Sequence, residues 1–139
     1  NNLPHRNFTL IFMSDMENKY RYHDEAWCRN IANHIKTIKN KNLYFTNYPN
    51  EKIDPQFVIH GGDLSDTKFE WKMTADQLFS STYQQFYDAG IPFISSLGNH
   101  DLLNYENGGN TPYAEAVKFV DQSFQKAAAL SPEFTYQKI

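Results

Sequence analysis

Short apolar runs recur along this 139-residue chain, and each is followed by a cluster of polar residues. The runs at 8–14, 56–60 and 92–97 have the length and composition of buried β-strands. A shorter apolar stretch, Phe-Thr-Tyr at 134–136, predicts the start of a fourth strand. The sequence therefore predicts three or four strands spaced widely along the chain.

Between these runs, apolar residues recur at intervals of three and four, which is typical of amphipathic helices. This period predicts helices over 24–40 and 72–89, and a third from Thr111 to Ser131. The asparagine-rich segment 41–55 is predicted to be a loop. The resulting order, β-α-β-α-β-α, has crossovers long enough for parallel pairing. It indicates an α/β fold with a parallel or mixed sheet and helices on its faces.

Side chains that can bind metal follow all three predicted strands. Asp15 and Glu17 come after the first strand, Asp63 and Asp66 after the second, and the tetrad Gly98-Asn99-His100-Asp101 after the third. Open α/β sheets bind their ligands beyond the carboxyl ends of the strands, where these clusters are expected to lie. The pattern thus predicts one site at this edge of the sheet.

The series resembles the motifs of the calcineurin-like metallophosphoesterases, which run Asp-x-His, Gly-Asp-x-x-Asp and Gly-Asn-His-Asp. The second and third motifs match without gaps at 62–66 and 98–101. The first matches at Asp15, but Glu17 stands where the family has histidine. The resemblance covers roughly residues 8 to 104. It implies the first half of the family's two-sheet β-sandwich flanked by helices.

What the resemblance implies about chemistry is hydrolysis of a phosphomonoester or phosphodiester by a hydroxide held between two divalent or trivalent metal ions (Mn, Fe, Zn or Mg). The metal ligands that it implies are Asp15, Glu17, Asp63 and Asn99, with Asp63 bridging the two ions. His100 is implied as the catalytic group facing the substrate, where it can protonate the leaving oxygen. Asp101 is implied as its catalytic partner, which hydrogen-bonds His100 and sets its tautomer.

Each candidate also has a purely structural interpretation. An aspartate after a strand is most often a turn or cap residue, Asn99 is an ordinary turn former, and Glu17 can simply point to solvent. Asp66 is better explained as an N-cap or turn residue than as a ligand. His60 is better explained as a packed or hydrogen-bonded residue at a strand end than as a metal ligand.

No histidine follows His100, whereas the family's remaining ligands are downstream histidines. One interpretation is a single domain over 1–139 that is incomplete at its C-terminus. The missing half-domain would then come from downstream sequence, another chain or self-association. The alternative is a catalytically degenerate member of the fold that serves as a binding or scaffold module. The intact pair His100-Asp101 favours an enzyme.

Composition narrows the choice further. The net charge of −3 and the scattered basic residues give no electrostatic footprint for nucleic acid. No apolar stretch approaches the roughly 18 residues that a membrane span needs. The one cysteine, Cys28, excludes a disulfide within the chain. We expect a soluble protein, either cytoplasmic or secreted after signal removal, with an aromatic-rich core, since 16% of residues are aromatic.

Overall fold

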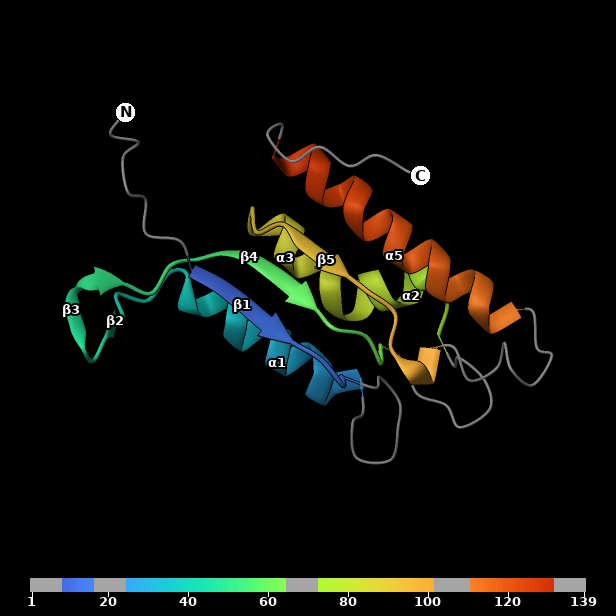
Figure 1. Cartoon of the computed structure of the whole chain (residues 1–139), viewed down its shortest axis with the longest axis horizontal. Helices are drawn as coiled ribbons and strands as arrows, with labels where there is room; N and C mark the ends of the chain where they lie inside the picture. Colours follow the sequence, from blue (N-terminus) through green and yellow to red (C-terminus); the bar gives the residue numbers. More distant parts are fainter. Residues whose placement is uncertain (1–8, 17–24, 65–72, 102–110, 132–139) are drawn as a thin grey trace.

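A three-stranded parallel sheet organises the protein. The computed structural model describes residues 9–16, 25–64, 73–101 and 111–131, without the side chains of 111–113. The sheet has the order β1-β4-β5 and consists of β1 (Thr9–Met13), β4 (Pro55–His60) and β5 (Phe93–Ser95) (Figure 1). The predicted parallel sheet is confirmed. It places β4, which precedes Asp63, at the centre.

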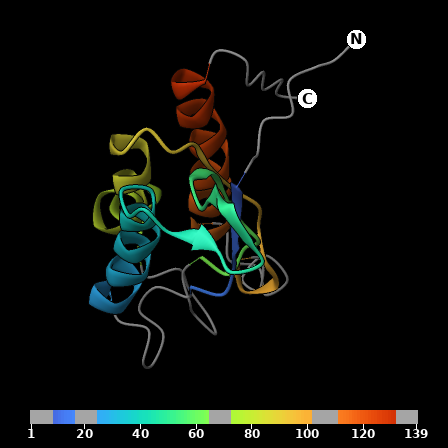
Figure 2. The ribbon, with the colours of Figure 1, turned by 90° about the vertical axis from the view of Figure 1, so that its left-hand side faces the viewer.

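The helices pack against one face of this sheet (Figures 1 and 2). Alternation along β4 and β5 turns Val58, His60, Phe93 and Ser95 toward them, and all four are buried. The helical elements are α1 (Glu25–Ile38), α2 (Ala75–Leu78), the π-helical turn η1 (Phe79–Tyr83), α3 (Gln84–Asp88) and α5 (Thr111–Leu130). Among the described residues, no helix combines the length and apolarity that a membrane crossing requires.

Aromatic rings fill the space between helices and sheet, as the composition predicts. Phe79 stacks on Phe119 of α5 with 4.3 Å between ring centroids, and Tyr83 stacks on Phe93 at 4.8 Å. Phe86 lies parallel to Phe93 at 5.6 Å. Offset and edge-on contacts of this kind add to the stabilisation that burial alone provides. One aromatic cluster therefore joins η1, α3 and α5 to the sheet.

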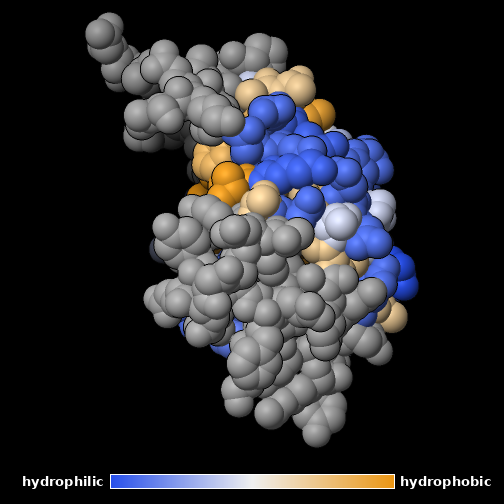
Figure 3. All heavy atoms as spheres, turned by 90° about the vertical axis from the view of Figure 1, so that its right-hand side faces the viewer, coloured by the Kyte–Doolittle hydropathy of each residue, from blue (hydrophilic) through white to orange (hydrophobic). Residues whose placement is uncertain are grey.

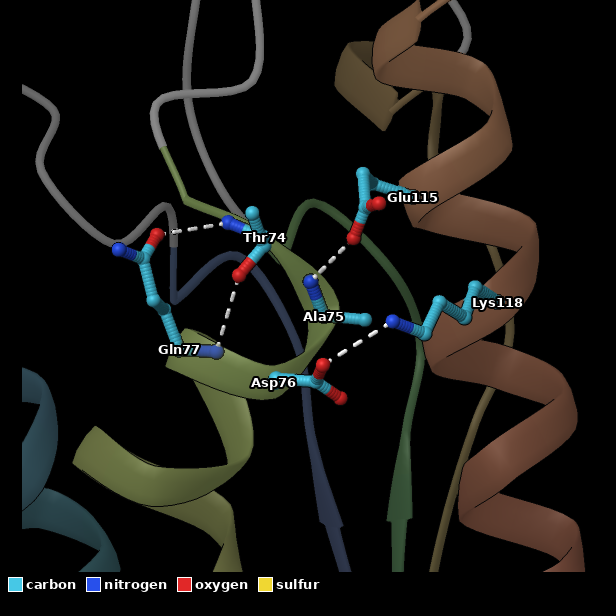
Figure 4. A network of polar contacts seen from close by, with 6 residues as sticks. All are labelled: Thr74, Ala75, Asp76, Gln77, Glu115 and Lys118. Atoms are coloured by element: carbon cyan, nitrogen blue, oxygen red, sulfur yellow. Dashed lines mark hydrogen bonds and ion pairs between the residues drawn. The ribbon is translucent and has the colours of Figure 1, made fainter.

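The prediction of one continuous helix over 72–89 was wrong in two respects. The helix begins only at Ala75, because Thr74 and Gln77 form a capping box: each side chain accepts a hydrogen bond from the backbone N–H of the other, at 3.2 and 2.9 Å (Figure 4). The helix then widens to a π turn over Phe79–Tyr83, where Ser80 Oγ donates to the Gln77 carbonyl at 3.1 Å. Periodicity alone does not register a one-residue insertion of this kind.

The segment predicted as a loop at 41–55 instead contains a β-hairpin. Strands β2 (Tyr44–Phe45) and β3 (Tyr48–Lys52) pair antiparallel, and the backbone N–H of Ile53 donates to the Leu43 carbonyl at 2.8 Å. The hairpin projects from the end of the sheet opposite to the strand ends that carry the motifs (Figure 1). Because nearly all of its residues are exposed, it has no alternation of apolar and polar positions to predict it. The strand predicted at 134–136 lies outside the described residues.

Candidate functional site

The loops after β1 and β4 are joined by backbone hydrogen bonds where these strands end. The N–H of Gly61 donates to the Met13 carbonyl at 2.8 Å, and the N–H of Asp15 donates to the Gly62 carbonyl at 3.1 Å. These bonds continue the parallel pairing of β1 with β4 beyond the strands. They bring the backbone of Asp15 beside that of Gly62 and Asp63, as the sequence predicts.

The loop after β5 is attached to the same place through the side chain of Asp63. The Oδ1 atom of Asp63 accepts the backbone N–H of His100 at 2.9 Å, and Asp63 as a residue is 8% exposed. Asn99, His100 and Asp101 are helical in the described part of the chain. The bond therefore holds the start of this helical segment against Asp63, the residue that the resemblance implies as the bridging metal ligand.

Asp101 holds the second and third motifs together. Its buried carboxylate accepts three backbone N–H groups, from Asp63 at 2.9 Å, Leu64 at 3.1 Å and Gly98 at 2.8 Å. This clamp was not predicted. The spacing of the motifs does not show that the Asp101 carboxylate accepts hydrogen bonds from backbone N–H groups as far away in sequence as Asp63, 38 positions earlier. The predicted contact of Asp101 with His100 stays a prediction. Asp101 positions the loops in either case.

The backbone at both candidate aspartates adopts the left-handed region, with φ 57° at Asp15 and at Asp63. Such conformations cost of the order of 1 kcal/mol or more for a residue with a side chain, although aspartate tolerates them better than most. Gly62 (φ 106°) and Gly98 approach each other so closely that a methyl group on either would overlap the other loop; on Gly98 it would meet Asp63. Strain and close approach thus concentrate at this edge, as they do at functional sites.

His60 contacts the loop after β4 from the core side of the sheet. Its ring is buried, and Nδ1 accepts the backbone N–H of Gly62 at 3.1 Å. Burial lowers the pKa of His60 to about 4, against the opposing effect of the Asp15 charge, so the ring is neutral near pH 7. The structure agrees with the interpretation of His60 as a packed, hydrogen-bonded residue at a strand end.

The donor atoms at this edge suit oxygen-preferring cations, but they form only part of a complete site. Asp15 and Asn99 are exposed, Asp63 is nearly buried and His100 is half-buried. Glu17 and Asp66 lie outside the described residues. Over the ranges that the structure describes, no three or more His, Cys, Asp or Glu side chains form a group that could hold a metal ion. Two carboxylates and one amide oxygen fit Mn²⁺ or Mg²⁺ better than Zn²⁺, and they leave coordination positions for further ligands.

Seen from the end where the strands finish, the described surface is mostly hydrophilic, with a smaller hydrophobic area beside it (Figure 3).

Strand β1 exposes apolar side chains on one of its two faces. Ile11 and Met13 pack on the core, whereas Leu10 and Phe12 face away from it and are 46% and 68% exposed. The site edge thus lies next to an apolar stretch of β1.

Comparison with known proteins gave one result for this chain. A family model described as calcineurin-like phosphoesterase matches residues 8–133, which include all three motif loops. Searches of curated proteins and of solved structures gave no significant match.

Proposed function

This chain belongs to the calcineurin-like phosphoesterase family, and we propose that it acts as a metal-dependent hydrolase of phosphate monoesters or diesters. The observation that carries the proposal is the position of Asp63. Its backbone N–H donates a hydrogen bond to the Asp101 carboxylate, and its own carboxylate accepts one from the backbone N–H of His100. The carbonyl of the preceding residue, Gly62, accepts one from the backbone N–H of Asp15. The residue that resembles the family's bridging ligand is therefore linked to both other motifs.

The proposal assigns distinct roles to these residues. Asp15, Asp63 and Asn99 would hold the cations, and Asp63 is suited to bridging because one carboxylate offers two oxygens. Paired metal ions, when bound, supply an activated water and offset the charge of the phosphate during in-line displacement. His100 would donate a proton to the leaving oxygen. Asp101 would keep the two loops in register.

A second candidate function is a non-catalytic binding or scaffold module. It is favoured by the finding that the described residues contain no complete set of three metal-binding side chains. The two functions differ in one measurable property, because a scaffold has no need to bind metal at Asp63.

The test uses the complete form of the protein, which supplies the remaining proposed ligands. It compares three variants with the wild type for Mn²⁺ binding by calorimetry and for hydrolysis of p-nitrophenyl phosphate and bis-p-nitrophenyl phosphate. Asp63→Asn should abolish binding and turnover together, because the bridging charge is lost. His100→Ala should leave binding nearly unchanged and lower turnover about 10²–10⁴-fold. Asp88→Asn, on the exposed surface of α3, is the matched control and should change neither. A complete wild-type protein that neither binds metal nor hydrolyses either ester would establish the scaffold alternative.

Further ligands are part of the proposal. We propose Glu17 as a metal ligand, which predicts that Glu17→His moves metal preference toward Zn²⁺, the ion that favours imidazole. The ligands still missing would come from further sequence, another chain or self-association. The 139-residue chain by itself should then bind metal weakly and show little hydrolysis, and strong turnover from it would contradict this assignment.

A further inference from the structure

His60 is an unusual residue to bury where it lies. Its side chain is 0% exposed and packs among aromatic rings, 5.7 Å from the Tyr83 centroid and 6.1 Å from that of Phe93. Placing a polar ring in such surroundings costs free energy unless its nitrogens find partners. An aliphatic or aromatic side chain would fill the same space without that cost.

One nitrogen has a partner that no apolar residue can supply. The Nδ1 atom accepts the N–H of Gly62, a buried residue beyond the end of β4 whose φ is 106°. The backbone carbonyl of His60 also accepts the N–H of Ser96 at 3.0 Å. His60 therefore contacts the loop after β4 through its side chain and the chain after β5 through its backbone.

The hydrogen bond also fixes the tautomer of the ring. An Nδ1 that accepts an N–H carries no proton, so the neutral ring is protonated at Nε2. Among the described residues, Nε2 has no hydrogen-bond partner. Since the second nitrogen gains nothing from its surroundings there, the bond from Gly62 is the contact that accounts for an imidazole at this position.

We propose that His60 is a positioning residue of the site: through Nδ1 it fixes the left-handed turn at Gly62 and Asp63 and thereby aims the Asp63 carboxylate. The effect on metal affinity rests on the proposed function; the effect on the turn does not. Partners that orient a metal ligand from behind typically account for 10–100-fold in metal affinity.

Three substitutions separate the acceptor from the packing. His60→Asn keeps an acceptor oxygen close to the position of Nδ1, and His60→Leu keeps apolar volume without an acceptor. Tyr83→Phe is the matched control, because it alters the same cluster by removing a buried hydroxyl that has no partner among the described residues. In ¹⁵N-labelled wild-type protein, we expect a scalar coupling across the hydrogen bond between the Gly62 amide nitrogen and His60 Nδ1, and a proton on Nε2.

Amide exchange at Gly62 and Mn²⁺ calorimetry then read out the consequences. His60→Leu should lose protection at Gly62 and weaken Mn²⁺ binding about tenfold, whereas His60→Asn should retain most of both and Tyr83→Phe all of both. The proposal is overturned if the coupling is absent, if His60→Leu matches the wild type in Gly62 protection, or if Tyr83→Phe is equally damaging. If wild-type protein binds no Mn²⁺, the proposed function fails, and Gly62 protection in the two His60 variants decides this inference alone.

Discussion

The aromatic core and the loops at the strand ends are neighbouring regions that are built in opposite ways. In the core, rings from α5, η1 and β5 pack together, and the Tyr87 hydroxyl donates a hydrogen bond to the Phe93 carbonyl at 2.7 Å. In the loops, two aspartates take left-handed conformations and Gly62 and Gly98 nearly touch. Stability is concentrated in the first region and strain in the second. A well-packed core can support a strained edge because the surrounding structure over-determines it.

Residues at the boundary connect the two regions. Asp101 and His60 are both buried with the core, yet their polar atoms bind backbone amides of the loops. The geometry of the site is therefore set from inside the protein rather than by the loops themselves. This division predicts that core substitutions mainly lower stability with little effect on site geometry, whereas loop substitutions change site geometry at a smaller cost in stability.

The largest effect on stability should come from the core. Phe119→Ala removes a ring that is 0% exposed and stacked on Phe79, and should lower the free energy of unfolding by about 3–5 kcal/mol. Val117→Ala, on the exposed side of the same helix, is the control and should change it by less than about 0.5 kcal/mol. Urea denaturation measures both. Equal effects of the two changes would show that the aromatic cluster does not dominate stability.

The second effect is a pH dependence caused by His60. Its pKa is about 4 in the folded protein and about 6.5 when unfolded, so between these values only the unfolded chain takes up the proton. Well above pH 6.5 the ring is neutral in both states and does not affect the free energy of unfolding. As the pH falls below 6.5, protonation of the unfolded chain lowers that free energy. The loss should reach about 3 kcal/mol by pH 4. Denaturation of the wild type and of His60→Leu across this range measures it, and parallel curves for the two proteins would contradict it.

The third effect separates geometry from stability at the loops. Gly98→Ala puts a methyl group against Asp63 and should cost about 1–3 kcal/mol through overpacking while removing metal binding. Gly90→Ala is the control: Gly90 has a φ of 72°, but no atom lies within 4 Å of the added carbon. It should cost about 1 kcal/mol from backbone strain and leave metal binding intact. Calorimetry with Mn²⁺ that finds the two variants alike would show that the close approach does not shape the site.

The smallest effects are expected at exposed residues at the start of α2 (Figure 4). Thr74→Ala removes the capping box and should lower the free energy of unfolding by about 1 kcal/mol. Lys118→Ala breaks an exposed ion pair with Asp76, 3.1 Å long, and should leave the denaturation midpoint unchanged because solvent screens the pair. A larger effect of Lys118→Ala than of Thr74→Ala would reverse the order of these two contacts.

The sequence by itself determined the order of the main strands and helices, the parallel sheet and the edge where the motifs meet. These follow from local patterns: apolar runs specify β1, β4 and β5, and each polar cluster lies directly after its strand. The family of the chain was also predictable, because the tetrad 98–101 and the motif beginning at Gly62 are contiguous in sequence.

Only the tertiary structure decided the β2–β3 hairpin, the π turn in the middle helix, and the partners of Asp101 and His60. The hairpin has no buried face to impose a pattern, and the π turn differs from an α-helix by a single inserted residue. The backbone N–H groups that Asp101 accepts depend on how β4 and β5 align side by side. The N–H that His60 accepts depends on which way its ring turns at the end of β4. The sequence names these residues, but their donors and acceptors meet only once the sheet and the aromatic core have packed together.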